Sequence, residues 1–293
     1  MPTYPDWIVN AVRRNKAELR GTAACGTAAE LAARSLHTVC DEARCPNKGK
    51  CFSEGEATFL ILGDICTRNC GFCAVTKARP LPPDPGEPLR AAELCAKWRL
   101  KYVVFTSPTR DDLPDGGAAH FAETNRRIKE LSPGIKTEPL IPDFKGDVRA
   151  LETVLASAPD VLGHNLEMVA GLYAQARTGA DYGRSLAVIA NAKRLRPATL
   201  TKSGIMLGLG ETGAELETAL GDLVEHGCDL LTLGQYLAPT KTHRPVQKYY
   251  TEEEFARWGE KARAAGFRAV LSGPLVRSSY RASALYGEAA ARP

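Results

Sequence analysis

The sequence has no long hydrophobic run. No apolar stretch approaches the ~18 residues that a membrane-spanning helix needs, so we expect no membrane segment. Residues 1–7 lack a basic segment followed by an apolar one, which predicts no secretory signal peptide and a cytoplasmic location. The chain also lacks an internal repeat and a low-complexity tail, and this excludes a fibrous protein.

The composition is that of an ordinary globular protein. Hydrophobic residues make up 44% of the 293 residues and charged residues 25%, so the chain is too apolar to be disordered. The length is compatible with two domains, but an α/β barrel of this size commonly forms a single one.

The net charge of +4 is too small to indicate nucleic-acid binding, but its distribution is uneven. Residues 1–50 carry a net charge of +3 and residues 241–293 a net charge of +5, so the middle of the chain carries −4. Ordinary solvated surface explains this most simply. Alternatively, the two ends meet in space and offer a mildly basic face to an acidic partner.

Cysteine is the informative residue type. The count of nine is odd, which argues against a disulfide framework in a chain without a signal peptide. Six of the nine form two triplets, Cys40-x4-Cys45-x5-Cys51 and Cys66-x3-Cys70-x2-Cys73. Such clustering indicates metal or redox chemistry. The others are expected to be core or incidental residues: Cys25, Cys95 and Cys228.

From residue 57 onward, short apolar runs alternate with amphipathic stretches. We expect strands at 58–62, 102–106, 136–140, 161–165, 203–207, 230–235 and 268–271. We expect helices at 89–98, 119–131, 148–156, 184–195, 214–225 and 252–264. This alternation is typical of repeated βαβ units with a parallel sheet, and both an open doubly wound sheet and a barrel fit it.

Three local patterns mark boundaries. Thr251-x-x-Glu254 predicts a capping box at the start of the last helix, and Thr27-x-x-Glu30 predicts the cap of a short helix before the first triplet. Five prolines within residues 79–88 predict an extended connector.

The second triplet follows the strand at 58–62, and ligands of parallel α/β folds bind at the carboxyl ends of strands. Structural zinc closes its shell with four ligands, but neither triplet has an obvious fourth cysteine or histidine beside it. A four-iron cluster on three thiolates keeps one iron open for a substrate or cofactor. The triplets therefore favour two clusters, each with one unusual site. The alternatives are a zinc-stapled module or unpaired buried cysteines.

Residues 66–73, Cys-Thr-Arg-Asn-Cys-Gly-Phe-Cys, match the C-x3-C-x-aromatic-C motif of radical S-adenosylmethionine (SAM) enzymes. With the first triplet before it, the chain resembles the lipoyl synthase family. Further matches lie at 106–113, 164–167, 202–211 and Arg277-Ser278-Ser279-Tyr280, and the resemblance covers roughly residues 36–285. The chain departs from the family at Pro108, where valine is more usual, and at Met168, where threonine is common.

The resemblance implies two 4Fe–4S clusters with different tasks. The cluster on Cys66, Cys70 and Cys73 binds SAM through its open iron and cleaves it to a 5′-deoxyadenosyl radical. The radical abstracts hydrogen from carbons 6 and 8 of an octanoyl chain that is amide-linked to a lysine. The auxiliary cluster then inserts sulfur at both carbons, and its implied ligands are Cys40, Cys45, Cys51 and Ser279.

The resemblance also implies partners and a fold. The substrate is an octanoylated lipoyl carrier protein or domain, and the reductant is a donor such as ferredoxin or flavodoxin. No nucleic acid or membrane is involved. We expect a partial (β/α)6 TIM-type barrel at 57–267, an extension at 1–56 with the auxiliary cysteines and an extension at 268–293, both over the barrel mouth. Alternative functions are another radical SAM sulfur-inserting enzyme or an iron–sulfur electron-transfer protein.

Residues 208–213 formally match the G-x-G-x-x-G pattern of dinucleotide folds. Those folds need an acidic residue at the end of the next strand, where this chain has Gln235, so we reject nicotinamide binding. In radical SAM enzymes the corresponding segment borders the adenosine, and here it contains Gly204, Met206, Gly208 and Glu211. We expect these glycines to let the backbone approach a ligand closely.

Other polar residues also follow strands. His164 and Asn165 should face the barrel mouth, and we interpret the single histidine as structural. Arg110, Asp111 and Asp112 follow the strand at 102–106. Two interpretations of these three residues stay open, a salt-bridged loop cap or contact with the amino acid end of SAM.

Overall fold

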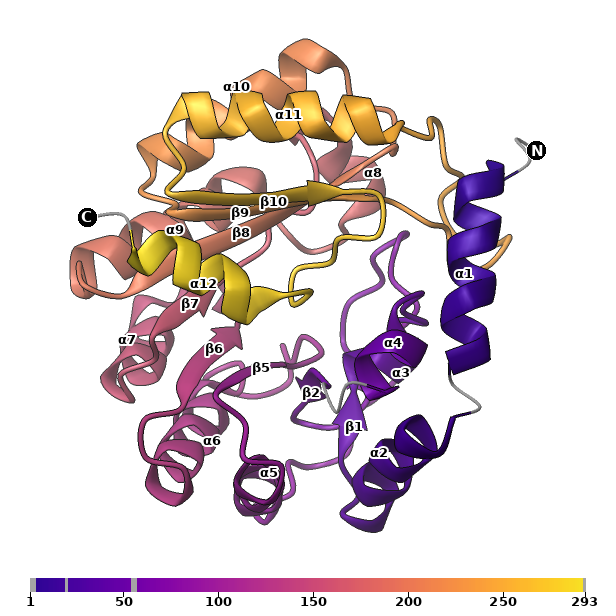
Figure 1. Cartoon of the computed structure of the whole chain (residues 1–293). Coiled ribbons are helices and arrows are strands. Elements are labelled where there is room, and N and C mark those ends of the chain that lie inside the picture. The colour runs from indigo at the N-terminus through magenta and orange to yellow at the C-terminus, as the bar shows by residue number, and fades with distance from the viewer. Residues whose placement is uncertain (1–3, 19–20, 54–56, 292–293) are drawn as a thin grey trace.

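The computed structural model describes residues 4–18, 21–53 and 57–291. Within these residues, one eight-stranded sheet has the order β1-β2-β5-β6-β7-β8-β9-β10. All neighbours from β2 to β10 are parallel, and only β1 pairs antiparallel, with β2. The strand order never reverses, as it does in a doubly wound sheet, so the sheet curls into a partial barrel (Figure 1). The expected fold class is confirmed.

The elements of the barrel follow the expected alternation. Its strands are β1 (His37–Thr38), β2 (Phe59–Leu60), β5 (Tyr102–Thr106), β6 (Lys136–Leu140), β7 (Val161–Gly163), β8 (Leu200–Leu207), β9 (Leu230–Gln235) and β10 (Ala269–Gly273). The main crossover helices are α5 (Glu87–Lys97), α6 (Ala118–Leu131), α7 (Val148–Ala156), α9 (Tyr182–Leu195), α10 (Gly213–Glu225) and α11 (Glu252–Ala265). Shorter elements in the loops are β3 (Ile65–Cys66), β4 (Thr76–Lys77), η1 (Phe144–Gly146), η2 (Ala170–Leu172) and α8 (Tyr173–Ala176).

Each crossover helix buries its apolar face against the sheet. In α6, Phe121 and Ile128 are fully buried, and the Phe121 ring packs 5.9 Å from the ring of Phe105 on β5. In α10, Leu216 and Leu220 occupy the corresponding face. Burying one such side chain contributes about 1.5–3 kcal/mol to folding. Among the described residues, no helix has the length and apolarity to cross a membrane.

Four helices of the described residues lie before β2: α1 (Asp6–Glu18) and α2 (Thr22–Ala33) precede β1, and α3 (Val39–Glu42) and α4 (Lys48–Ser53) follow it. Both α1 and α2 pack on α4, which carries the end of the first triplet (Figure 1). The predicted cap at Thr27 is wrong, because α2 begins before it and Thr27 lies inside the helix. The Thr27 hydroxyl instead donates to the carbonyl oxygens of Ala23 and Phe52, at 3.2 and 2.9 Å.

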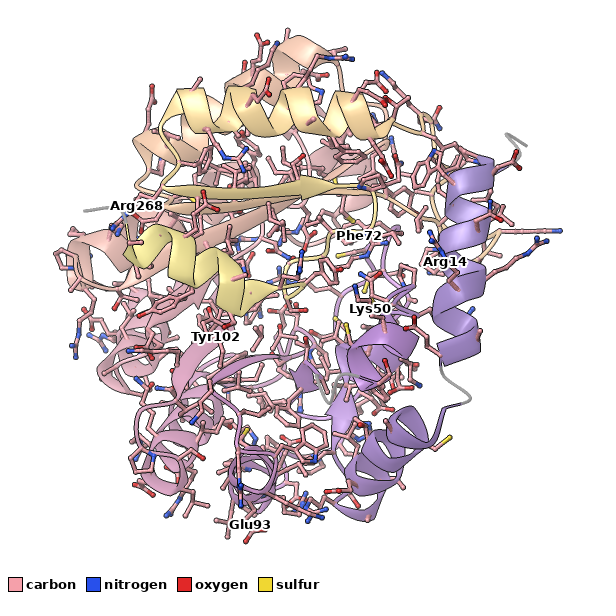
Figure 2. The ribbon with its side chains drawn as sticks, in the orientation of Figure 1. Arg14, Lys50, Phe72, Glu93, Tyr102 and Arg268 are labelled. Carbon is pink, nitrogen blue, oxygen red and sulfur yellow. The ribbon has the colours of Figure 1, made fainter. Side chains whose placement is uncertain are left out.

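The C-terminal helix α12 (Ala282–Ala290) lies across the open side of the barrel, against β10 and β5 (Figure 1). Its Leu285 and Ala289 pack on the first residues of four strands, Val161, Leu200, Leu230 and Ala269. The ring of Tyr286 lies 5.7 Å from that of Tyr102, which sits beneath α12 (Figure 2). The helix thus runs toward the amino ends of the strands, while residues 274–280 before it lie at their carboxyl ends.

Candidate functional site

The second cysteine triplet lies in a loop at the carboxyl ends of the strands, as predicted. Backbone hydrogen bonds fix this loop from several sides. The Thr67 amide donates to the Thr109 carbonyl after β5 at 3.0 Å, and the Gly71 amide donates to the Ala176 carbonyl at the end of α8 at 2.9 Å. The Arg244 amide donates to the Gly71 carbonyl at 2.9 Å. The loop is therefore part of the barrel mouth.

Arg68, between the first two cysteines of this loop, is the centre of a buried ion-pair network. Its guanidinium donates two hydrogen bonds to Asp111 and two to Asp143, all at 2.7–3.0 Å. Arg184 donates to Asp143 from a further element, α9, at 2.8 Å. Burial alone would raise the pKa of the Asp143 carboxyl, but the two arginines outweigh it and hold that pKa well below its usual range. The network ties the loop to the ends of β5, β6 and α9.

Three thiols of the triplets, those of Cys40, Cys70 and Cys73, are hard to ionise without a metal. Burial raises the pKa of Cys40 to about 12 and that of Cys70 to about 11. Burial also raises the pKa of Cys73. Metal binding must therefore displace protons from these sulfurs, which is ordinary for thiolate ligands.

The spacing of the sulfurs bears on which metal fits. Two sulfurs on one zinc ion lie no more than ~4.6 Å apart, twice the Zn–S bond length. Across the part of the chain that is described, neither triplet brings its three sulfurs within 4.8 Å of one another. The donor set itself, three thiolates with no fourth cysteine or histidine beside them, suits an iron–sulfur cluster that keeps one iron open.

The first triplet meets the C-terminal segment. Cys40 is buried, Cys45 and Cys51 are partly exposed, and the side-chain amide of Asn47 between them donates to the Leu275 carbonyl at 2.7 Å. Burial lowers the pKa of the Arg277 guanidinium, and the nearby Cys45 sulfur opposes this shift. The structure thus brings residues 45–47 next to residues 275–277, as expected if both contribute to one centre.

The two serines of the C-terminal segment have different surroundings. The Ser278 hydroxyl accepts a hydrogen bond from the Asn165 side chain at 2.7 Å. The Ser279 side chain, in contrast, has no hydrogen-bond partner within residues 4–18, 21–53 and 57–291. The side chain of Ser278 is therefore engaged with the barrel, and that of Ser279 is available.

A pair of opposite charges beside the second triplet was missed by the sequence analysis. Arg177 partly offsets the effect of burial on the pKa of Cys70, whereas Glu167 adds to the raised pKa of both Cys70 and Cys73, so Arg177 lies within electrostatic range of Cys70 and Glu167 within range of both sulfurs. Burial raises the pKa of Glu167 itself. Residues 164–167 had been noted as a family match, but nothing in the sequence marked Arg177. The carboxyl group of Glu167 and the guanidinium of Arg177 can bind the ammonium and carboxylate groups of a zwitterion.

The glycine segment after β8 has a structural role within the chain, and its position beside the adenosine stays a prediction. The Glu211 carboxylate accepts hydrogen bonds from the amides of Gly208, Leu209 and Gly210 at 2.6–3.1 Å. A Cβ atom at Gly208, where φ is +104°, would lie 2.3 Å from the Gln235 side chain. The close approach is therefore to the chain itself, and Glu211 is occupied with folding its own loop.

The other predicted polar residues are structural. Arg110 is buried and donates two hydrogen bonds to Asp112, at 2.9 and 2.8 Å, and Asp111 pairs with Arg68. The structure thus favours the salt-bridged loop cap. His164 is buried, and its Nδ1 donates to the Ile141 carbonyl at 2.9 Å. Cys95 and Cys228 are buried, whereas Cys25 is exposed on α2.

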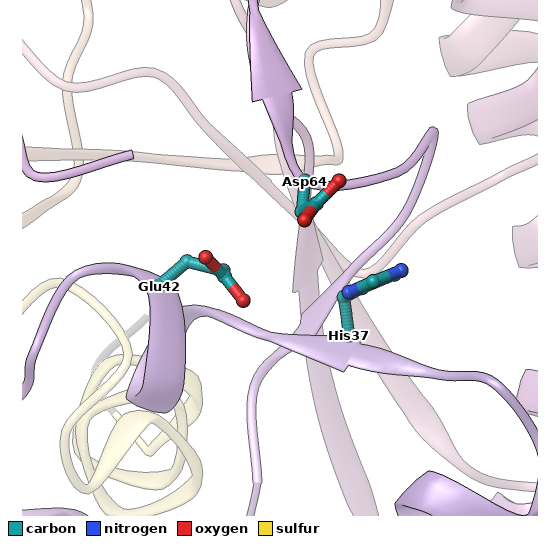
Figure 3. A group of neighbouring side chains, drawn as sticks. All are labelled: His37, Glu42 and Asp64. Atoms are coloured by element: carbon teal, nitrogen blue, oxygen red, sulfur yellow. The ribbon is translucent and has the colours of Figure 1, made fainter. Parts of the chain in front are cut away.

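One further group of polar side chains comes from residues before, within and after the first triplet. Single ligand atoms of His37, Glu42 and Asp64 lie within 4.8 Å of one another (Figure 3). They come from β1, from the end of α3 and from the loop before β3. Oxygen and nitrogen ligands suit a hard cation and not a sulfide cluster. These side chains are partly exposed, and exposed acidic groups are common without an ion.

Comparison of the sequence with known proteins gives consistent results. The Radical SAM superfamily profile matches residues 60–223, which include the second triplet but neither the first triplet nor residues 277–280. A lipoyl synthase of Citrifermentans bemidjiense is 57% identical over 247 residues, which cover 84% of each chain. A lipoyl synthase of Geobacter metallireducens is 51% identical over 284 residues, or 97% of this chain and 98% of that one. An alignment of this length includes both triplets and the C-terminal segment.

Solved structures support the fold alone, because their sequence identity is low. The FeFe-hydrogenase maturase HydG of Carboxydothermus hydrogenoformans is similar with a TM-score of 0.61 at 13% identity, covering 78% of this chain and 55% of that chain. Methylornithine synthase is similar with a TM-score of 0.55 at 14% identity, covering 72% of this chain and 62% of that chain.

Proposed function

Because the chain belongs to the lipoyl synthase family of the radical SAM superfamily, we propose that it makes the lipoyl group. The reaction inserts two sulfur atoms, at carbons 6 and 8 of an octanoyl chain on a carrier lysine. The partners are an octanoylated carrier domain and a reductant of the ferredoxin or flavodoxin type. We place the reaction in the cytoplasm, where the thiols stay reduced.

The observation that carries this proposal is the meeting of residues 45–47 of the first triplet with residues 275–277, which directly precede Ser278 and Ser279 in the chain. A radical SAM enzyme needs only the second triplet for its radical chemistry. A second set of three cysteines, next to the segment that carries Ser279, indicates a second cluster. Its ligands are Cys40, Cys45, Cys51 and Ser279, and those of the radical cluster are Cys66, Cys70 and Cys73. The contacts of Asn47 with Leu275 and of Cys45 with Arg277 support this set.

When bound, the two clusters supply an electron that cleaves SAM and the sulfur that enters the product. The chain's own residues position the reactants. Arg177 acts electrostatically on Cys70, and Glu167 acts on both Cys70 and Cys73, so groups of opposite charge lie near this triplet, which suits the carboxylate and ammonium groups of SAM. The ion pairs of Arg68 with Asp111 and Asp143 hold the loop of residues 66–73, the cluster loop, in place. We distinguish three parts of the chain, 1–56, 57–267 and 268–293, of which the first and the last each add one strand, β1 and β10, to the sheet of the middle part. Residues 1–3, 19–20, 54–56 and 292–293 lie outside the described residues.

The test is anaerobic reconstitution followed by iron analysis and mass spectrometry of an octanoyl-lysine peptide. The wild-type chain should bind about eight irons, four for each cluster. The variant with Cys66, Cys70 and Cys73 changed to Ala should bind half as many and form no 5′-deoxyadenosine. The variant with Cys40, Cys45 and Cys51 changed to Ala should still form 5′-deoxyadenosine but no thiolated peptide. Full sulfur insertion by either variant would overturn the assignment.

A further inference from the structure

Asn165 connects the surroundings of the two cysteine triplets. Its side-chain nitrogen donates to Glu167 Oε1 at 3.0 Å and to Ser278 Oγ at 2.7 Å. Glu167 lies within electrostatic range of Cys70 and Cys73. Ser278 precedes Ser279 in the segment that meets Cys45. One amide group thus contacts residues beside both centres.

The donor capacity of Asn165 is fully used by these two contacts. An asparagine amide carries two hydrogens, and one is directed to each partner. Gly204 on β8 leaves the space for this arrangement, because a Cβ atom there would lie 3.0 Å from Asn165 Oδ1 and 3.1 Å from Ser278 Oγ. Asn165, which follows β7, and Ser278 of the C-terminal segment therefore pack directly on the backbone of β8 at Gly204.

The position of Ser279 depends on its neighbours in the chain. Arg277 donates to the Gln235 carbonyl at 3.0 Å, and the Val276 carbonyl packs so closely on Gly234 that a Cβ atom there would lie 2.1 Å away. These contacts hold the segment before Ser278. The hydrogen bond from Asn165 is the side-chain contact nearest to Ser279 that holds the segment to the barrel interior.

We propose that Asn165 is a positioning residue that fixes Ser279 at the auxiliary cluster by holding Ser278. The same side-chain amide also donates to Glu167, which lies at the proposed SAM site, so one residue contacts both sites. The inference rests on the proposed role of Ser279 as a cluster ligand. A residue of purely structural importance would affect the stability of the fold, whereas a positioning residue affects the iron that Ser279 holds.

The experiment measures how fast a chelator removes the first iron from the reconstituted full-length enzyme. Asn165→Ala should accelerate this loss about 5- to 10-fold, as expected for one lost hydrogen bond at a partly buried site. The ratio of 5′-deoxyadenosine to lipoyl product should rise in parallel. Ser278→Ala should have a similar effect, and the double variant should be no worse than either single one, because both remove the same bond.

Two further variants separate positioning from general damage. Asn165→Asp keeps an acceptor for the Ser278 hydroxyl but sets a like charge against Glu167, so iron retention should stay near wild type while KM for SAM rises. Asn125→Ala is the matched control, since the Asn125 amide donates at 2.7 Å to the Ser157 carbonyl, a contact between α6 and the end of α7. It should leave iron loss unchanged.

The possible results distinguish this inference from the assignment of the ligand. If Ser279→Ala loses iron rapidly while Asn165→Ala and Ser278→Ala behave like wild type, the inference on Asn165 is wrong and the ligand assignment stands. If Ser279→Ala also retains its iron, the ligand assignment is wrong. Should Asn165→Ala fail to fold, Ser278→Ala and Asn165→Asp decide the question by the same measurement.

Discussion

Ser279 is the residue whose chemistry differs most from that of its proposed fellow ligands. A serine oxygen is a harder and weaker partner for iron than a thiolate, so the iron it holds should be lost first. Loss of that iron would make the sulfide of the proposed cluster accessible to the substrate. We therefore predict that Ser279→Ala has an unstable auxiliary cluster and makes no lipoyl product while 5′-deoxyadenosine still forms. Iron analysis and mass spectrometry check this.

Two other substitutions sharpen the prediction for Ser279. Ser279→Cys should hold the iron more firmly and also impair sulfur insertion, because the iron is released less readily. Ser278→Ala should be milder than Ser279→Ala, since it removes the hydrogen bond with Asn165 but no ligand. An inactive Ser278→Ala beside an active Ser279→Ala would show that the wrong serine was assigned.

His164 predicts a pH dependence of stability. Burial, with a smaller effect of Arg177, lowers the pKa of His164 from 6.5 to about 4 in the folded chain. Between these two values the unfolded chain binds the proton more strongly, so stability falls as the pH drops from about 6.5 to about 4. At about 1.4 kcal/mol per unit, the loss reaches about 3 kcal/mol.

The measurement is the denaturation midpoint across that pH range for wild type and His164→Asn. The Asn amide can donate to the Ile141 carbonyl in place of Nδ1. The variant should be less sensitive to acid than wild type between pH 6.5 and 4. Parallel curves for the two proteins would contradict this account of His164.

At the scale of elements, the cluster loop depends on Arg68 for its place at the barrel mouth. The Arg68 and Asp143 side chains are 8% and 1% exposed, so removing the arginine leaves a buried carboxylate without its main partner. Arg68→Ala should destabilise the fold by about 3–5 kcal/mol, and reconstitution of the radical cluster should suffer with it. Arg68→Lys should be intermediate, because it keeps the charge but not the paired hydrogen bonds. Denaturation curves of both variants equal to that of wild type would refute this role.

The elements of the barrel were largely predictable, because their signals are local. The predicted strands at 102–106, 136–140 and 230–235 have the bounds of β5, β6 and β9, and the capping box at Thr251 and Glu254 is present. The pattern at Thr27 failed because the same residue types also occur inside a helix, where Thr27 bonds back to Ala23.

The cysteine ligands could be proposed from spacing, but the residues that support them could not. Arg68 and Asp143 are 75 positions apart, and Asn165 and Ser278 are 113 apart. Such pairs form only when the strands of the barrel bring their carboxyl ends together. No local pattern encodes them, and the approach of Glu167 and Arg177 to Cys70, which is distant from both in the chain, belongs to the same class.

At the scale of the whole molecule, the two basic ranges of the sequence, 1–50 and 241–293, contact each other at two points. The rings of Tyr4 and Tyr249 lie 5.9 Å apart, and Asn47 bonds to Leu275. Exposed basic residues lie on α1, where Figure 2 labels Arg14, and at Lys241 in the loop after β9. This arrangement supports a mildly basic face near the barrel mouth.

A basic face of this kind predicts a salt dependence of carrier binding. Charges at the rim of an interface steer association and are screened by ions. The apparent affinity for an octanoylated carrier domain should fall as ionic strength rises, whereas activity on a short octanoyl-lysine peptide should change less. Kinetics at several salt concentrations check this, and an equal dependence for both substrates would count against a charged docking face.

The central claim is that the first cysteine triplet holds the sulfur that enters the product. The direct measurement is reconstitution with sulfide of a heavy sulfur isotope, removal of free sulfide, and mass spectrometry of the lipoyl peptide formed with SAM and a reductant. The account predicts two heavy sulfur atoms in the product of the wild-type chain and no lipoyl product when Cys40, Cys45 and Cys51 are changed to Ala. A product with only light sulfur, or a labelled product from that variant, would contradict it.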